Sequence, residues 1–417
     1  MKIFKEIPSS SISDLIWMLS LFAILIIFTS INSVPNVEAK FVFSKKWGTL
    51  GSGNGEFKSP EGIAIDSSGR VYIADTGNNR IQQFRLANPC PSGTSQTESG
   101  VCFVRSWGSL GTGNGQFNKP LDVALDSTGR VYVADSDNKR IQMFKGNGDF
   151  IRTWNTDGPG TAQFGKIVGI TVDNSNNEIY AADSKIQGQG VVHKFRLANS
   201  CAVGSSQVVA GVCFVVKWTY GQPPEVPPDP FHSLLGISVN SVTHNVYVSH
   251  YQDYDVPISK SDENWILREA DNGNHLTEWG GDISSADGKL NRATGIAIGP
   301  SGLIYVADTG NNRIQTFQLV KPVGLCPAGT AKVTLGVCLL TKWGTPGSAN
   351  GQFDFPSDIA VGPSGHMYVA DTGNNRIQVF KKDGTYVRET FIALKTLGAG
   401  SVWDIELCRD PNQTYMY

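Results

Sequence analysis

Six histidines and a recurring aspartate are the residues of this sequence that could bind a metal ion or transfer a proton. A metal-dependent enzyme needs histidine or carboxylate ligands that converge from several parts of the chain on one ion. The histidines fall at unlike places in their sequence surroundings, so no set of equivalent ligands can be drawn. We therefore predict no catalytic residues and no metal site, and leave bound calcium or zinc as an open alternative. The six are His193, His232, His244, His250, His275 and His366.

The aspartates recur because a whole phrase recurs. ADTGNNRIQ stands at residues 74–82, 307–315 and 370–378. Asparagine and glycine tolerate positive φ, and an aspartate can accept turn amide hydrogens, so the phrase is typical of a tight turn. We interpret the repeated carboxylates as turn caps, and the repeated arginines as partners of carboxylates or of backbone carbonyls. The residues are Asp75, Asp135, Asp308 and Asp371, with Arg80, Arg140, Arg313 and Arg376.

Each phrase lies in a longer unit. The unit reads Trp-Gly, a Gly-rich loop ending in Phe, a short apolar run, a glycine turn, Tyr-Val-Ala-Asp or a variant, and Arg-Ile-Gln-x-Phe. Runs of about five residues that are rich in β-branched side chains and bounded by turn residues are typical of strands. The Gly-rich phrases lack the Lys-Ser/Thr ending of a phosphate loop. We expect them to join the first and second strands, and the repeated phrase to join the third and fourth.

Tryptophans mark six consecutive units, and Trp107 and Trp154 are 47 residues apart. Repeats of this length with four strands each are typical of a β-propeller. The predicted fold is therefore all-β, with six complete four-stranded blades. Thr390 follows Trp343 by the same interval, so we expect a partial seventh blade, or a sequence that is a fragment. The tryptophans are Trp47, Trp107, Trp154, Trp218, Trp279 and Trp343.

Six of the seven cysteines form three pairs at one spacing, each ending in Gly-Val-Cys. The regular spacing predicts disulfides within hairpins, whereas zinc sites have shorter gaps and histidines nearby. Each bridge would contribute roughly 3 kcal/mol on the chain-entropy model. We expect the hairpins between the fourth strand of one blade and the first of the next, at every second junction and on one face. The pairs are Cys90 with Cys102, Cys201 with Cys213, and Cys326 with Cys338.

These units resemble the NHL repeat family. The matching phrase Tyr-Val-Ala-Asp-Thr-Gly-Asn-Asn-Arg-Ile-Gln is complete in two units and nearly complete in two more, and the resemblance covers about residues 41–417. It implies a propeller, commonly six-bladed. It implies much less about function, because such propellers serve as protein- or RNA-binding modules and, in a minority such as the peptidyl-amidating lyases, as enzymes.

Charge and the N-terminus limit the compartment and the partners. A net charge of -2 without a basic patch argues against nucleic acid. Lys2 and Lys5 precede an apolar stretch from Leu15 to Phe28, and the small-residue pattern before Lys40 fits cleavage of a secretory signal. We predict a signal peptide at 1–39, with an uncleaved membrane anchor as the alternative, and a secreted or cell-surface propeller at 40–417.

The fourth unit departs furthest from the repeat, in its first loop TYGQPPEVPPDPF and its turn HYQDYDVPISKSDEN. We expect both insertions at one rim, opposite the cysteine hairpins. Acidic and aromatic side chains there suit a cationic or carbohydrate-like ligand, or a partner protein. A lengthened loop without a ligand is the competing interpretation. The candidate residues are Glu225, Asp229, His250, Tyr251, Asp253, Tyr254 and Asp255.

Two functions follow from these features. The first is an exported scaffold that binds a protein or small ligand without catalysis. The second is a metal-dependent lyase or hydrolase with its site in the central channel. The even distribution of turn residues and the scatter of the histidines favour the scaffold.

Overall fold

The structure is a computed structural model that describes most of residues 51–391. Within that range it omits 67, 88, 99–100, 157–162, 187–188, 203, 221–231, 253–262, 273, 321–324, 363–364 and 375. The described strands all belong to one compact unit, Lys45–Tyr417. The predicted signal or anchor at 1–39 lies outside the described residues. No helix in the described part is long and apolar enough to cross a membrane.

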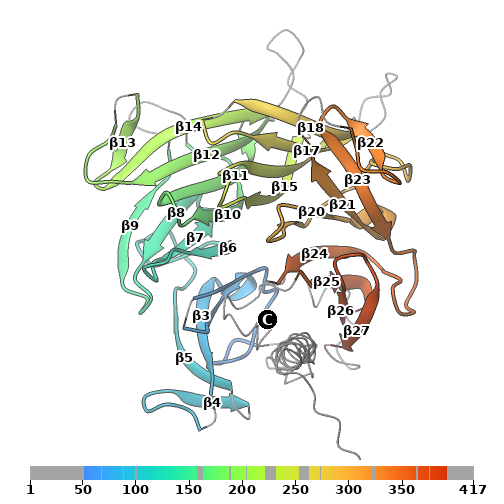
Figure 1. Ribbon diagram of the computed structural model, residues 1–417. Coiled ribbons are helices and arrows are strands. Elements are labelled where there is room, and N and C mark those ends of the chain that lie inside the picture. Colours follow the sequence, from blue (N-terminus) through green and yellow to red (C-terminus); the bar gives the residue numbers. More distant parts are fainter. Residues whose placement is uncertain are drawn as a thin grey trace, which may run out of the picture. The chain divides into compact units, whose positions relative to one another are not determined.

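The chain folds into a six-bladed β-propeller, as the sequence predicted (Figure 1). Three blades are four-stranded antiparallel sheets in chain order. Sheet two holds β6 (Pro120–Leu125), β7 (Val131–Asp135), β8 (Arg140–Phe144) and β9 (Phe150–Trp154). Sheet four holds β15 (His232–Val239), β16 (Val246–Gln252), β17 (Glu263–Glu269) and β18 (His275–Asp282). Sheet six holds β24 (Pro356–Val361), β25 (Met367–Asp371), β26 (Arg376–Phe380) and β27 (Tyr386–Phe391).

The other three blades carry a fifth strand on the outer edge. Sheet one has the order β1 (Gly62–Ile65), β2 (Arg70–Asp75), β3 (Arg80–Leu86), β5 (Val101–Trp107) and β4 (Ser95–Glu98). Sheet three has β10 (Ile167–Asp173), β11 (Glu178–Ile186), β12 (Gln189–Leu197), β14 (Val212–Tyr220) and β13 (Ser206–Val209). Sheet five has β19 (Ile296–Ile298), β20 (Ile304–Asp308), β21 (Arg313–Leu319), β23 (Val337–Trp343) and β22 (Ala331–Thr334).

Short 3-10 turns form the repeated phrase in three blades: η1 (Thr76–Asn78), η2 (Thr309–Asn311) and η3 (Thr372–Asn374). Each turn joins the second and third strands, so the prediction that it joins the third and fourth is wrong. The strand that ends in tryptophan pairs with the preceding blade, as Trp107 does with Ile81. The Gly-rich loops consequently connect one sheet to the next, and do not join the first and second strands of a blade.

Assigning each tryptophan strand to the preceding blade also changes the interpretation of the last unit. Thr390, predicted to begin a seventh blade, pairs with Ile377 in β27 and completes sheet six. The remaining part of the predicted seventh blade, residues 392–417, lies outside the described residues.

The three predicted disulfides are confirmed, each with a sequence separation of 12 residues. They occur in every second sheet, as expected, but each lies between the third and fourth strands of one sheet and not at the junction of two. The predicted placement is wrong because it assigned the tryptophan strand to the following sheet. The bridges are Cys90–Cys102, Cys201–Cys213 and Cys326–Cys338.

The second cysteine of each bridge shows the correction most directly. Cys338 lies in β23, the fourth strand of sheet five, where it pairs with Gln318 of β21 and with Lys332 of the edge strand β22. The sequence predicted that Cys338 belongs to a protruding connection between blades. It is instead fully buried and belongs to the body of the sheet. Cys102 takes the same place in sheet one, where it pairs with Gln96 of β4.

The blades pack through their faces. The first strands of consecutive sheets are neighbours in the order β1, β6, β10, β15, β19 and β24, and Figure 1 shows β6, β10 and β15 side by side. The second strand of sheet two is buried at all five positions. Sheets crowd near the centre, where a Cβ on Gly62 would lie 2.6 Å from the Cα of Asp122. Small and β-branched residues therefore recur along the inner strands because two faces must be covered.

Candidate functional site

The repeated aspartate accepts hydrogen bonds from four directions. In sheet one, Asp75 Oδ2 accepts from Arg80 Nε at 2.7 Å and from Gln82 Nε2 at 3.1 Å. Asn78 Nδ2 lies 3.0 Å from both carboxylate oxygens, and the Lys58 amide donates to Oδ1 at 2.8 Å. We call the Asp, Asn, Arg and Gln side chains of such a set the loop clamp. The carboxylate is fully buried and its hydrogen bonds are made within the blade.

The loop clamp holds the Gly-rich loop that enters the blade. Arg80 Nη1 donates to the Ser52 carbonyl at 2.7 Å, and its Nη2 donates to the carbonyls of Gly53 and Glu56 at 2.7 and 2.9 Å. Gln82 Nε2 also donates to the Glu56 carbonyl, at 2.7 Å. Residues 27 positions apart are thereby joined through side chains, which stiffens one rim of the blade. The interpretation of the repeated arginines as partners of carboxylates and carbonyls is confirmed.

Four sheets carry the complete loop clamp, with Arg Nε to Asp Oδ2 distances of 2.6–2.7 Å. Burial raises the pKa of Asp308 and of Asp371, although the arginine of each clamp acts in the opposite direction. The four carboxylates are therefore structural groups, but the prediction that they cap their own turns is wrong for Asp75 and Asp308, which make no side-chain cap hydrogen bond to η1 or η2. The pairs are Asp75–Arg80, Asp135–Arg140, Asp308–Arg313 and Asp371–Arg376.

Sheet three keeps a modified version. Asp183 holds the aspartate position and accepts from the Gly165 amide at 2.7 Å. His193 takes the place of the clamp glutamine, fully buried, with Nε2 3.5 Å from Asp183 Oδ2.

Sheet four departs further. His250 pairs with Trp265 where Asp75 pairs with Arg80, and Leu267 stands at the glutamine position. Sheets three and four therefore both lack the Asp–Arg pair, since Asp183 pairs with Val191, but sheet four also lacks the aspartate.

The histidines do not converge. His244, in the turn between β15 and β16, has Nδ1 2.6 Å from Asp173 Oδ2 of sheet three, whereas His275 Nδ1 lies 2.9 Å from Glu269 Oε1 within sheet four. Among the described residues, no group of three or more histidine, cysteine or acidic side chains is placed to hold a metal ion.

The predicted recognition residues divide into two groups. His250 and Tyr251 lie in β16 and are buried, at 5% and 8% exposure. The Arg292 guanidinium lies 5.4 Å from the centre of the Tyr251 ring, an arrangement that favours a cation–π contact. These two side chains belong to the body of the blade, and Tyr251 is not a surface residue. The remaining candidates lie outside the described residues: Glu225, Asp229, Asp253, Tyr254 and Asp255.

The insertions themselves lie outside the described residues, but the strands that border them are described. One insertion connects β14 to β15 and the other connects β16 to β17. In an antiparallel sheet the connection into the first strand and the connection from second to third strand emerge at the same end. The cysteine hairpins connect third to fourth strands and emerge at the opposite end. The prediction assigned each strand to a position one place too late in its sheet. That error does not change which connections share an end of the sheet, because successive connections alternate between the two ends.

A second polar set, which sequence reasoning missed, lies at that opposite end. Asp126 Oδ2 accepts from Arg130 Nε and from the Tyr132 hydroxyl, at 2.5 and 2.7 Å. Asp126 Oδ1 accepts from the Thr128 hydroxyl at 2.6 Å. Asp66, Ser68, Arg70 and Tyr72 repeat the arrangement in sheet one. The signal was present as Asp-x-[Ser/Thr]-Gly-Arg-Val-Tyr, but it was interpreted only as a turn.

Replacing Asp126 with asparagine is expected to remove part of the acid sensitivity of the fold. Burial acts to raise the pKa of Asp126, but hydrogen bonds from Thr128, Tyr132 and Arg130 outweigh it and lower the pKa. The stabilisation is therefore present above the unfolded-state pKa of about 3.9 and is lost as pH falls through the lower folded-state value. We expect the variant to lose about 1–3 kcal/mol at pH 7 and less at pH 3, measured by urea unfolding.

Asp308→Asn is the matched control, because the pKa of Asp308 is raised. Because its pKa is raised, the protonated Asp308 carboxyl favours the folded state. That stabilisation is lost as pH rises through the folded-state pKa. Parallel pH profiles for the two variants would contradict the assignment.

Comparison with known proteins identifies four segments of this chain as NHL repeats, at residues 57–84, 117–144, 290–317 and 353–380. These are the segments with complete loop clamps. Human NHL repeat-containing protein 3 is 37% identical over 94 residues, which is 21% of this chain and 23% of that protein.

Solved structures agree on the fold. Virginiamycin B lyase from Staphylococcus aureus has a TM-score of 0.50 and 16% identity, and the match covers 81% of this chain and 85% of the lyase. A candidate 6-phosphogluconolactonase from Bacteroides fragilis also has a TM-score of 0.50, with 15% identity over 82% of this chain and 87% of that one. At such identities the likeness concerns the fold alone.

Proposed function

We propose that this chain, a six-bladed β-propeller with NHL repeats, is an exported scaffold that binds a protein or a small ligand and catalyses no reaction. One observation carries the proposal. Four of the six sheets hold the loop that enters the blade with an Asp–Arg clamp, and sheet four, whose sequence carries the two insertions, departs furthest from that pattern because it lacks the aspartate as well as the arginine. A rigid frame with one divergent segment is typical of a binding module.

Three disulfides indicate an oxidising, extracellular type of environment. Export through the segment at 1–39 is the route we propose, with the uncleaved anchor as its alternative. The chain would then present its loops outside the cytoplasm in either case.

The recognition surface that we propose consists of the two inserted loops of sheet four. Their sequences bring together Glu225, Asp229, Asp253, Tyr254 and Asp255. Carboxylates beside an aromatic ring suit a cationic group or a carbohydrate-like ligand, and the same features suit a basic protein surface. His250 and Tyr251 lie in β16, which precedes the second insertion in the chain.

Binding of the purified protein to glycan arrays and to lysine-rich peptide arrays tests this surface. We expect Tyr254→Ala with Asp255→Ala to weaken the strongest interaction at least tenfold, with little change in Tm. Asp383→Ala, in the exposed turn before β27 at the other end of sheet six, is the control and should bind like the wild type. Equal binding by all three proteins would remove these loops as the site.

Metal analysis separates the scaffold from the alternative enzyme. A scaffold should lose zinc and calcium on dialysis. Stoichiometric metal that survives dialysis, together with turnover of a lactone or lyase substrate, would instead favour a metal-dependent lyase or hydrolase.

A further inference from the structure

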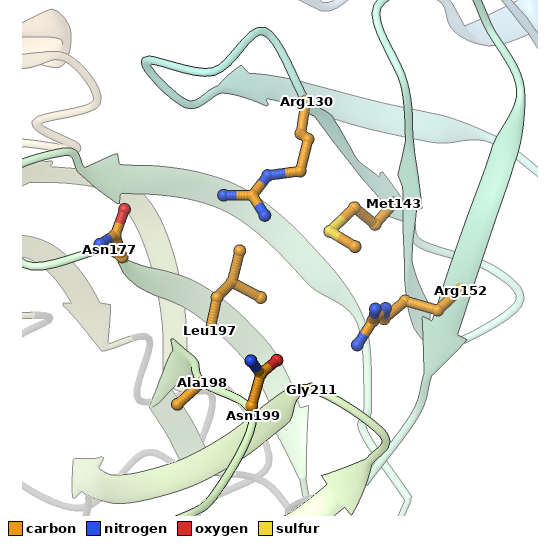
Figure 2. A pocket seen from close by; sticks show the side chains of 8 residues that line it. All are labelled: Arg130, Met143, Arg152, Asn177, Leu197, Ala198, Asn199 and Gly211. Atoms are coloured by element: carbon orange, nitrogen blue, oxygen red, sulfur yellow. The ribbon is translucent and has the colours of Figure 1, made fainter.

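A pocket of about 260 Å³ opens between sheets two and three, at the end of the blades that carries the cysteine hairpins (Figure 2). Strands β8 and β9 and the turn before β7 supply one wall, and the end of β12 with the turn before β14 supplies the other. The volume is close to the lower limit for small-molecule sites. The lining residues are Arg130, Met143, Arg152, Asn177, Leu197, Ala198, Asn199 and Gly211.

The junction between sheets one and two shows how this space is closed elsewhere. Arg105 pairs with Gln83 as Arg152 pairs with Met143, so the two arginines hold the same place in their blades. Arg105 Nη1 donates to the Asn147 carbonyl at 2.7 Å, and Gln83 donates to the Gly146 carbonyl at 3.1 Å. Both acceptors belong to the tight turn of the neighbouring sheet.

Sheet three has no such tight turn. Its third and fourth strands are joined by the long hairpin that carries Cys201–Cys213. The carbonyls that Arg105 and Gln83 use therefore have no counterpart opposite Arg152, and Met143 offers no donor of its own. Arg152 Nη1 is buried without a hydrogen-bond partner among the described residues. The space between the sheets is left as the pocket.

The pocket is positively charged. Arg130 uses Nε to pair with Asp126, and its terminal nitrogens make no hydrogen bond to a residue that the structure describes. Figure 2 shows the Arg130 side chain directed into the space above Leu197 and the Arg152 side chain entering from the side, toward Gly211 and Asn199. None of the residues that line the pocket is acidic. A buried arginine nitrogen without an acceptor is costly in free energy. A bound anion would supply the hydrogen-bond acceptor that Arg152 Nη1 lacks among the described residues.

The hairpin leaves room for this arginine. Gly211 stands in the turn before β14 with a φ of 76°, and a Cβ there would lie 2.4 Å from Arg152 Nη1. The other residues that line the pocket are either polar or apolar. Asn177 and Asn199 bring side-chain amides to the wall, whereas Met143 and Leu197 supply an apolar floor.

We propose that this pocket binds a small organic oxyanion, with a carboxylate, sulfate or phosphate head held by Arg152 and Arg130 and a short apolar body against Met143 and Leu197. Guanidinium groups bind all three heads through charge-assisted hydrogen bonds. The site lies at the opposite end of the blades from the start of β15 and the end of β16, the strand ends that border the two insertions. It is therefore a second binding site, independent of the recognition surface proposed above.

Isothermal titration of the purified protein with butyrate, butyl sulfate and butyl phosphate tests the proposal, with butyramide as the neutral counterpart. We expect saturable binding of at least one anion at one site per chain and none of butyramide. The anion that binds most tightly identifies the head group. Arg152→Gln should weaken that binding at least tenfold.

Arg105→Gln is the matched control at the equivalent position of sheet one. It should leave anion binding unchanged but lower Tm, because its hydrogen bond to Asn147 is lost. Arg152→Gln should not lower Tm in the absence of ligand, since no hydrogen bond to a described residue is lost. Butyramide binding as tightly as the anions, undiminished binding by Arg152→Gln, or no saturable heat at about 10 mM anion would each overturn the proposal.

Discussion

Replacing Arg376 with methionine is expected to lower the free energy of unfolding by about 3–5 kcal/mol. Arg376 is 1% exposed, and its Nε donates to Asp371 Oδ2 at 2.6 Å. Its terminal nitrogens donate to the carbonyls of Ser348, Ala349 and Gln352 at 2.8–2.9 Å. The variant therefore leaves a buried carboxylate without its cation and removes one donor from each of three carbonyls, of which Ala349 keeps the Gln352 amide and Gln352 keeps Gln378 Nε2. Chemical denaturation at pH 7 measures the loss.

Lys145→Met is the control for the loss of an ion pair. Lys145 and Asp149 lie 3.6 Å apart with both side chains largely exposed. An exposed pair of this kind contributes about 0–1 kcal/mol. If Arg376→Met cost no more than Lys145→Met, the loop clamp would not stabilise the blade.

Replacing Trp279 with alanine is expected to lower the free energy of unfolding by about 3–5 kcal/mol. Trp279 lies in β18, the last strand of sheet four, is 1% exposed, and its ring centre lies 5.4 Å from that of Phe317 in sheet five. It belongs to a buried cluster that includes Ile304 and Val337 of sheet five, so its removal opens a cavity between two blades. Urea unfolding, followed by intrinsic fluorescence of the remaining tryptophans and by circular dichroism, measures the change.

Trp279→Phe separates ring packing from indole hydrogen bonding. The Trp279 indole nitrogen is buried without a hydrogen-bond partner among the described residues. Phenylalanine keeps an aromatic ring and removes that unsatisfied group, so we expect a loss below about 1.5 kcal/mol. Equal losses for the two variants would contradict the assignment of this stabilisation to packing of an aromatic ring.

The sequence was sufficient for the class of fold and for the disulfides. Five-residue apolar runs, turn phrases and a spacing of 47 residues are local or periodic signals, and each repetition strengthens them. The cysteine pairs were found for the same reason, since one spacing occurred three times. The repeated aspartates were recognised as structural because they always accompanied the turn.

The sheet boundaries needed the tertiary structure. Trp279 is followed by the sequence of the next unit and packs on Phe317 of that unit, so its packing assigns it to sheet five. Its backbone pairs with Ile266, which places it in sheet four. Cys338 was misplaced for the same reason, because its pairing with Gln318 joins it to sheet five. Packing between blades and hydrogen bonding within a blade therefore group the same strand differently, and sequence patterns report packing more directly than pairing.

The sites show the same division. The sequence by itself determined a propeller with stiff repeated turns, because those features depend on residues a few positions apart. Only the tertiary structure decided that Tyr251 lies within the blade, and that Arg152 meets no carbonyl across the junction where Arg105 meets Asn147. Both outcomes depend on which group of a neighbouring strand or sheet faces the side chain, and no spacing along one strand specifies that group.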